Sequence, residues 1–123
     1  MTAKKNKIEE SWGYEEIIAR TSKYVVKKLF IKAGQRLKKQ FRLQGEEDIY
    51  VDNGVLLLDL SEREGESNIL KLESGRRWRI QPKKIYCFCT SDDQDTTLFR
   101  IVAAKKNDVF YFDATARRLN AKI

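Results

Sequence analysis

Cationic and amide side chains occupy alternate positions of residues 35–43, and their spacing suggests a site for anions. Side chains two positions apart in a β-strand share one face, so this segment predicts a strand with one polar and one apolar face. The polar face carries Arg36, Lys38, Gln40 and Arg42, and the apolar face carries Leu37, Phe41 and Leu43. Guanidinium and ammonium groups bind phosphate and carboxylate oxygens, so the polar face is a candidate anion site. Lys38 and Lys39 are adjacent and face opposite sides, so at least one of them is a solvated surface residue.

Three carboxylates at residues 46–48 follow this basic segment. From residue 23 to residue 42 the chain has eight Lys or Arg and no acid, whereas the charged residues from 46 to 66 are mostly acidic. One interpretation is that basic and acidic strands pair across a sheet. Asn53-Gly54 supplies the positive φ angles that a tight hairpin needs, which predicts a turn at this point.

Length and composition predict one globular domain. The chain has 123 residues, of which 41% are hydrophobic and 11% aromatic, enough to bury a core. The formal net charge of +7 suggests anionic partners, which include phosphates, acidic sugars, nucleic acid and membrane surfaces. No histidine is present, which removes the commonest general base and the commonest metal ligand. Because the sequence shows neither a membrane-spanning apolar run nor a signal peptide, we expect a cytoplasmic protein without a membrane partner.

The two cysteines, Cys87 and Cys89, lie two positions apart in a segment that is typical of a strand. They therefore point to the same side, at a spacing too short for an unstrained disulfide. We interpret them as two small half-buried residues, because this arrangement is commoner than a redox or metal site.

Short β-type runs separated by turn residues account for most of the chain. Further strands are predicted at residues 24–32, 49–60, 68–72, 78–81, 85–89, 97–103 and 109–112, and residues 12–18 form an arm or first strand. About eight to ten short strands with little helix predict an all-β sandwich or barrel. We place this domain at residues 8–114, after a flexible basic tail at 1–7 and before a short helix or tail at 115–123.

Four segments occur in an order that matches a known family: SWGYEEII, then YVVKKLFIKAGQRLKKQ, then E-D-I-Y-V-x-x-G-x-L-L-L, then W-R-I-Q-P-x-K-I-Y-x-F. They resemble a small single-domain cupin, and the resemblance covers roughly residues 12–103. The most similar type is the cupin domain of mannose-6-phosphate isomerase and mannose-1-phosphate guanylyltransferase. The resemblance implies a cupin-type double-stranded β-helix, which is a jelly-roll barrel.

The first cupin motif runs Gly, five residues, His-x-His, three or four residues, Glu, six residues, Gly. Gly34, Glu47 and Gly54 occupy its glycine and glutamate positions. Gln40 and Arg42 stand where the two histidines belong. Glutamine at the first of these positions also occurs in guanylyltransferase-type members, so this difference is the less informative one.

The second motif resembles Pro-Gly-x-x-His. Here Pro82 is followed by Lys83 in the glycine position and by Tyr86 in the histidine position. Of the family's four metal ligands only Glu47 remains, and Arg42 is a permanent cation that would repel a divalent metal. We therefore expect no metal and no other cofactor.

In a cupin barrel, the polar face of residues 35–43 would point to the interior or the mouth. The candidate ligand-binding residues are then Arg36, Lys38, Gln40, Arg42, Glu47 and Tyr86. Two interpretations stay open. Arg42 and Glu47 could form a salt bridge that fills the pocket, with Tyr86 hydrogen-bonded to it, or the cations could bind phosphate or carboxylate oxygens.

Three functions follow from these interpretations. The first is a metal-free cupin-fold protein that binds a small anionic ligand, such as a sugar phosphate or nucleotide sugar, in a basic pocket. The second is a sugar-phosphate isomerase or epimerase, in which only Glu47 and Tyr86 could move protons. The third is a dimeric module that binds protein or nucleic acid through basic residues interleaved with aromatic ones. These residues are Arg76, Arg77, Arg79, Lys83, Lys84, Arg117 and Arg118, with Trp78 and Tyr86. Since small cupins are often homodimers, we expect a homodimer, with residues 12–18 as an arm that could exchange between subunits.

Overall fold

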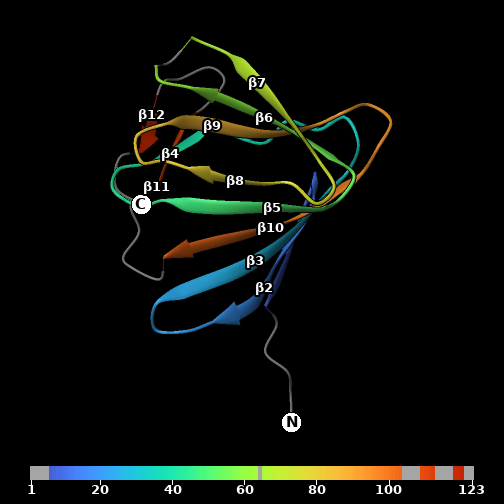
Figure 1. Cartoon of the computed structure of the whole chain (residues 1–123), viewed down its shortest axis with the longest axis horizontal. Helices are drawn as coiled ribbons and strands as arrows, with labels where there is room; N and C mark the ends of the chain where they lie inside the picture. Colours follow the sequence, from blue (N-terminus) through green and yellow to red (C-terminus); the bar gives the residue numbers. More distant parts are fainter. Residues whose placement is uncertain (1–5, 64, 104–108, 113–117, 121–123) are drawn as a thin grey trace.

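Two antiparallel sheets of six strands each face one another across a shared core (Figure 1). The computed structural model describes residues 6–63, 65–103, 109–112 and 118–120. The first sheet has the order β1 (Lys7–Glu10), β2 (Gly13–Arg20), β3 (Tyr24–Ile31), β10 (Thr96–Ala103), β5 (Glu47–Asn53) and β8 (Arg77–Ile80). The second has the order β12 (Arg118–Asn120), β11 (Val109–Phe112), β4 (Gln40–Arg42), β9 (Ile85–Thr90), β6 (Val55–Ser61) and β7 (Asn68–Glu73). Because β10 lies between β3 and β5, and β9 lies between β4 and β6, strands far apart in the sequence become neighbours, as in a jelly roll.

The core lies between the two sheets. Alternate side chains of each strand point inward, as expected from the two-residue period of a strand. The inward positions of the central strands are apolar and buried: Leu29, Ile31, Ile49, Val51, Leu56, Leu58, Phe88 and Leu98. At an ordinary gain of about 1.5–3 kcal/mol for each fully buried apolar side chain, these contacts supply most of the stabilisation of the barrel.

Most of the strands predicted from the sequence are confirmed. Residues 24–32, 68–72, 78–81, 85–89 and 97–103 all fall on strands, with ends displaced by no more than a residue or two. The predicted strand pair around Asn53-Gly54 is also present, as β5 and β6. Gly54 has a φ of +88°, and a Cβ there would lie 2.3 Å from the carbonyl oxygen of Asp95, so this position requires glycine. The described part of the chain contains no helix that could span a membrane.

A positive φ also occurs at Lys83, the only described residue other than glycine that has one, at 68°. This residue stands at the glycine position of the second cupin motif. Its backbone N–H donates a hydrogen bond to the carbonyl oxygen of Arg42 at 2.8 Å. Lys83 therefore has a left-handed backbone conformation, which costs about 1–2 kcal/mol for a residue other than glycine.

The continuous strand predicted for residues 35–43 is wrong. Within this segment only β4 is a regular strand. Arg36 forms an isolated bridge with Cys89 of β9. In one continuous strand, positions 37 and 40 would face opposite sides of the sheet. Here Leu37 packs against the core and Gln40 is buried as well. The alternation of inward and outward side chains therefore changes phase between positions 37 and 40. As a result, the polar residues before this change do not share a face with those after it.

The ends of the chain can be compared in part with the predictions. Residues 118–120 form β12, a strand rather than a helix, and the rest of the segment 115–123 lies outside the described residues. Residue Lys7 already belongs to β1, while residues 1–5 of the predicted tail are also outside the described part. The arm at residues 12–18 packs on its own barrel, with the backbone N–H of Lys32 donating to the carbonyl oxygen of Trp12 at 2.8 Å.

Candidate functional site

Five polar side chains from both sheets meet in the interior of the barrel. Gln40 and Arg42 come from β4 and Tyr86 from β9, while Glu47 comes from β5 and Arg100 from β10. The register of the strands brings them together, because Gln40 pairs with Tyr86 in one sheet and β5 pairs with β10 in the other. We call these five residues the central cluster. Glu47 and Tyr86 are each only 1% exposed.

The carboxylate of Glu47 is the acceptor at the centre of the cluster. Arg100 donates from Nη2 to Glu47 Oε1 at 2.9 Å and from Nε to Glu47 Oε2, so it grips both oxygens. Tyr86 donates its hydroxyl to Oε1 at 2.6 Å, and Arg42 donates from Nε to the same oxygen at 3.3 Å. Arg100 Nη2 also donates to Gln40 Oε1 at 3.1 Å. Among the described residues, no buried side-chain nitrogen or oxygen lacks a hydrogen-bond partner.

The ionisation of the cluster follows from these contacts. Burial alone would raise the pKa of Glu47, but the charge and hydrogen bonds of Arg100, followed by the charge of Arg42, outweigh it and lower that pKa. Burial, followed by the negative charge of Glu47, raises the pKa of Tyr86. Near neutral pH, Glu47 is therefore a carboxylate and Tyr86 a protonated phenol. Neither group is poised to exchange a proton with a substrate.

A divalent metal does not fit this arrangement. The one carboxylate of the site is held by two guanidinium groups, which are permanent cations. Its other neighbours are a phenol and an amide, in place of the neutral imidazoles that such metals prefer. In the described part of the chain, no three His, Cys, Asp or Glu side chains lie close enough together to hold a metal ion.

The structure brings four of the six sequence-predicted site residues together: Gln40, Arg42, Glu47 and Tyr86. Lys38 is exposed and does not join them. Arg36 lies on the outer face of the second sheet, where it bonds to Asp59 and Cys89. The expectation that Arg36 points to the interior or the mouth of the barrel is therefore wrong, and Lys38 does not share the inward face of Gln40, because the strand alternation changes phase between positions 37 and 40.

Arg100 was not predicted from the sequence, although it is the main partner of Glu47. Thr96, Leu98, Arg100 and Val102 alternate along β10 and all face inward. An arginine in such a row is a signal that a buried acid lies opposite, because a charge seldom occupies a core position without a partner. The identity of that acid depends on the pairing of β10 with β5, which the sequence does not specify.

A groove of about 450 Å³ lies outside the barrel, on the face of the first sheet beside the edge strand β8. Its lining includes Arg76 and Arg77, with Tyr50 of β5 opposite Arg77 in the strand register. Arg79 also lines it, but this residue is bound to Asp48 by two hydrogen bonds of 2.7 and 3.0 Å. The side chains of Arg76 and Arg77 make no hydrogen bond or ion pair with another described residue. We call this feature the outer groove.

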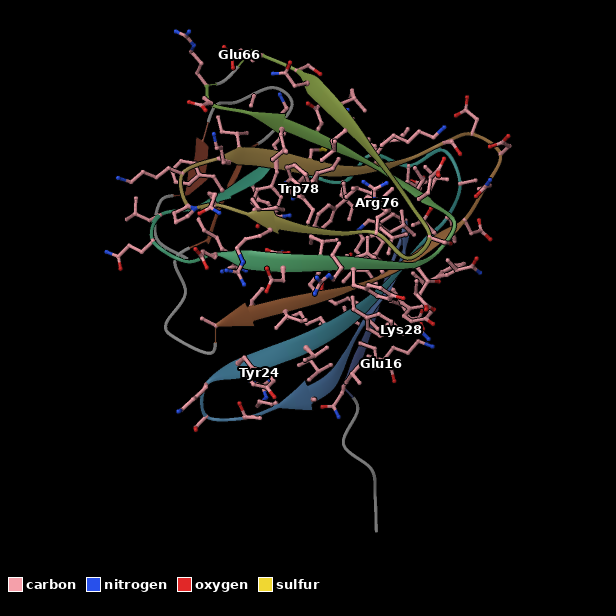
Figure 2. All side chains as sticks on the ribbon, viewed as in Figure 1. Glu16, Tyr24, Lys28, Glu66, Arg76 and Trp78 are labelled. Carbon is pink, nitrogen blue, oxygen red and sulfur yellow. The ribbon has the colours of Figure 1, made fainter. Side chains whose placement is uncertain are left out.

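A second groove, of about 260 Å³, adjoins the same strand where β8 faces the end of β6 and the start of β7. Trp78 and Arg79 line both grooves. Trp78 pairs with Ile49 and faces the core side of the sheet, yet it is 41% exposed because β8 is an edge strand. Figure 2 labels Arg76 and Trp78 along this edge. Both grooves are therefore lined in part by β8.

Comparison with known proteins identifies the fold. No protein-family model matches this chain, and no curated protein matches it. The polyketide cyclase RemF from Streptomyces resistomycificus is similar with a TM-score of 0.70 and 14% sequence identity, over 97% of this chain and 77% of RemF. An uncharacterized protein with a double-stranded β-helix domain from Klebsiella pneumoniae gives a TM-score of 0.66 at 14% identity, over 90% of this chain and 88% of that protein.

A variant of oxalate decarboxylase from Bacillus subtilis has a TM-score of 0.74 at 14% identity. The match covers 87% of this chain but only 30% of that enzyme, so this chain corresponds to a part of it. Identities this low show the fold alone. The strand order and these similarities lead to one conclusion: the chain has the cupin-type double-stranded β-helix fold.

Proposed function

We propose that this protein binds a small anionic ligand that carries phosphate, such as a sugar phosphate or a nucleotide sugar, and binds it in the outer groove. The observation that carries the proposal is the groove of about 450 Å³ beside β8, in which two exposed arginines lie next to aromatic side chains. Its volume is within the range of about 300–1,000 Å³ that is usual for small-molecule sites. This ligand class agrees with the resemblance to cupin domains of sugar-phosphate enzymes.

The charges of the outer groove suit a phosphate. Arg79 is matched by Asp48, so Arg76 and Arg77 provide the positive charge that a ligand would meet. A guanidinium group can donate two parallel hydrogen bonds to one phosphate. Two neighbouring arginines therefore suit a diphosphate, or a single phosphate held from two sides.

Aromatic residues also line the outer groove, beside these arginines. Tyr50 is 37% exposed and stacks on Phe99, with ring centroids 6.5 Å apart, so its ring is held in place. Trp78, on the core-facing side of β8, is a lining residue of both grooves. Exposed rings of this kind stack on the base or the sugar of a ligand. An extended ligand with phosphate at its centre would use both grooves.

The central cluster is a weaker candidate for the same role. Arg42 and Arg100 already bond to Glu47, and the side chain of Arg42 is only 12% exposed. Binding an anion there would require these contacts to open, at the cost of leaving a buried charge less well compensated. The isomerase alternative needs the same cluster, and Glu47 and Tyr86 are hydrogen-bonded to each other within it. We infer that the central cluster stabilises the barrel and that the ligand binds at the edge.

The test is a thermal-shift and calorimetric panel with inorganic phosphate, glucose 6-phosphate and GDP-mannose. A ligand at about 100 times its Kd should stabilise the fold by about 2.7 kcal/mol. We expect binding to be lost in the Arg76→Gln/Arg77→Gln double variant and kept in Arg63→Gln. Arg63 is a matched control because it is exposed and lies in the β6–β7 turn, where it pairs with Glu66. Loss of binding in Arg42→Ala but not in the double variant would place the site in the barrel and refute the assignment.

A single-stranded nucleic acid is the second candidate, because arginines interleaved with an exposed tryptophan also suit stacked bases. It would be supported by binding of a 12-nucleotide RNA that weakens steeply with salt, with no shift from any small ligand in the panel. Arg117, which the sequence adds to this basic set, lies outside the described residues. The homodimer stays a prediction, and sedimentation equilibrium over a range of protein concentrations checks it.

A further inference from the structure

Two cysteines lie side by side on the outer face of the second sheet, away from both sites above. In β9, Tyr86 and Phe88 point into the core, so Cys87 and Cys89 point to the other face. Their sulfur atoms are 3.8 Å apart. Arg36 reaches this pair from the segment before β4, and Asp59 reaches it from β6. Neither thiol takes part in the core packing that explains the rest of β9.

The contacts of the two sulfur atoms are different. Cys87 Sγ lies 2.9 Å from the carbonyl oxygen of Leu37, and a carbonyl oxygen can only accept, so Cys87 keeps its proton and donates it. Cys89 Sγ lies 3.2 Å from Nη1 of Arg36, and a guanidinium group can only donate, so Cys89 is an acceptor. Geometry alone therefore assigns Cys87 as the thiol and Cys89 as the sulfur suited to negative charge.

Arg36 is fixed in this position. Its Nη2 donates to Asp59 Oδ2 at 2.8 Å, and both oxygens of Asp59 accept a hydrogen bond from the hydroxyl of Ser67, at 3.0 and 3.1 Å. The side chain of Asp59 is 4% exposed, while that of Arg36 is 52% exposed. A buried carboxylate thus holds the cation against the sulfur, and the other side of the cation faces solvent. Cys89 is buried, with 7% of the residue exposed, so a small reagent would have to approach its sulfur along the half-exposed side chain of Arg36.

The electrostatics agree with this assignment. The contact with the neighbouring Cys87 thiol has the largest effect on the pKa of Cys89 and lowers it, burial opposes this, and the charge of Arg36 lowers the pKa further, leaving it below that of an ordinary thiol. The same contact and burial raise the pKa of Cys87. Low-pKa cysteines beside a cation, with partial access to solvent, are the reactive ones in proteins, whereas structural buried cysteines are inert.

We propose that Cys89 is a reactive thiolate and a modification site for soft electrophiles such as hydroperoxides, with Arg36 as the residue that positions and stabilises it. With a hydroperoxide, the Cys89 sulfur attacks the terminal oxygen. A sulfur–oxygen bond forms and the oxygen–oxygen bond breaks, so the thiolate is oxidised to sulfenic acid and the peroxide is reduced to an alcohol or water after its leaving oxygen takes a proton from solvent. A metal is a poor alternative occupant, because the guanidinium group of Arg36 already lies against the sulfur.

The experiment measures alkylation by iodoacetamide on the folded protein, by intact mass spectrometry, from pH 5.5 to 9.5. We expect one fast modification, located at Cys89 by peptide mapping, with a midpoint of the pH–rate profile below the roughly 8.5 of an ordinary thiol. Arg36→Gln should move this midpoint up by about one unit, and Arg36→Lys should restore part of the shift. The rate at pH 7 should fall only a few-fold, because a thiolate of higher pKa is intrinsically more nucleophilic.

Control variants separate reactivity from a change in folding. Arg63→Gln removes an exposed arginine elsewhere and should leave the midpoint unchanged, and Cys89→Ser should abolish the fast modification while Cys87→Ser keeps it. Melting temperatures of all variants are compared with the wild-type value. Treatment with hydrogen peroxide followed by a sulfenic-acid probe should label the wild-type protein and not Cys89→Ser. The proposal is refuted if neither thiol reacts faster than the chain unfolds, if Cys87 is the residue modified, or if Arg36→Gln leaves the midpoint in place.

Discussion

Replacing Arg100 by methionine should reverse the pH dependence of stability that arises from Glu47. The variant removes the guanidinium group that grips both carboxylate oxygens, and it also leaves Gln40 Oε1 without its donor at 3.1 Å. Breaking a buried ion pair by removing one partner costs about 3–5 kcal/mol. Because Arg42 and Tyr86 still contact the carboxylate, we expect a loss of about 3 kcal/mol at pH 7.

The sign of the pH effect follows from the pKa of Glu47 in the folded protein. In the wild type this pKa is lowered, so the stabilisation is fully present above the unfolded pKa of about 4.3 and is lost as the pH falls through the folded pKa. Burial is the largest effect on Glu47 and raises its pKa. Without Arg100 we expect burial to dominate, so that the folded state binds the proton more tightly. Stability is then lost as the pH rises above about 4.3, by up to about 1.4 kcal/mol per pH unit.

The assay is urea denaturation followed by tryptophan fluorescence, at half-unit steps from pH 4.5 to 7.5. In the wild type, Glu47 should not lower the free energy of unfolding as the pH rises over this range. In Arg100→Met, the free energy of unfolding should fall as the pH rises. The double variant Glu47→Leu/Arg100→Leu should recover most of the lost stability, because no charge of the pair then remains uncompensated. Its free energy of unfolding should show no pH dependence that arises from Glu47. Arg79→Met, whose partner Asp48 lies at the surface, is the matched control and should change stability much less.

Arg100→Lys keeps the positive charge and replaces the methionine variant if that variant does not fold. It should lose less stability, and its free energy of unfolding should depend less on pH. A loss below about 1 kcal/mol together with a flat pH profile in Arg100→Met would show that Arg100 is not what keeps Glu47 ionised, and the account of the central cluster would be wrong.

Three further predictions concern the backbone and the central cluster, and each is measured by urea denaturation at pH 7. Lys83→Gly should stabilise the fold by up to about 1 kcal/mol, because glycine adopts the positive φ without a steric cost. Lys83→Ala keeps that cost and should be nearly neutral. Equal effects of the two variants would contradict the presence of backbone strain at this position. Tyr86→Phe removes the 2.6 Å hydrogen bond to Glu47 and should cost about 1.5–3 kcal/mol, and a neutral result would mean that water replaces the hydroxyl. Gly54→Ala should cost about 2 kcal/mol or more through its clash with a backbone carbonyl, and Gly65→Ala, which meets nothing within 4 Å, should cost less.

The sequence was informative where one physical rule decides the local structure. Apolar and β-branched runs between turn residues predict most of the strands, and Asn53-Gly54 predicts the hairpin between β5 and β6. The strand pattern predicts an all-β sandwich or barrel, and the resemblance to a small cupin, which Gly34, Glu47 and Gly54 help to carry, implies the jelly-roll barrel in particular. These features depend on neighbours in the sequence, so a single chain is enough to show them.

Features that depend on distant neighbours were not predictable in the same way. The polar alternation from Arg36 to Arg42 assumes a strand of constant parity, but tertiary packing turns Leu37 inward and breaks that parity. In the sequence, Arg100 stands out only as a charged residue in a row of inward-facing positions. Its partner, Glu47, lies on a strand more than forty residues earlier in the chain. The different contacts of Cys87 and Cys89 likewise depend on residues brought beside β9 by the fold.

The contact between Arg100 and Glu47 also determines how β10 can pair with β5. A slip of one residue in this pairing would turn every side chain of β10 to the opposite face of the sheet. Arg100 would then point to solvent, while Glu47 would stay in the core without its main partner. An apolar row alone could tolerate such a slip with a loss of packing, but a buried carboxylate makes it far less favourable. The salt bridge inside the barrel therefore selects one alignment of the strands during folding, whatever it adds to the final stability.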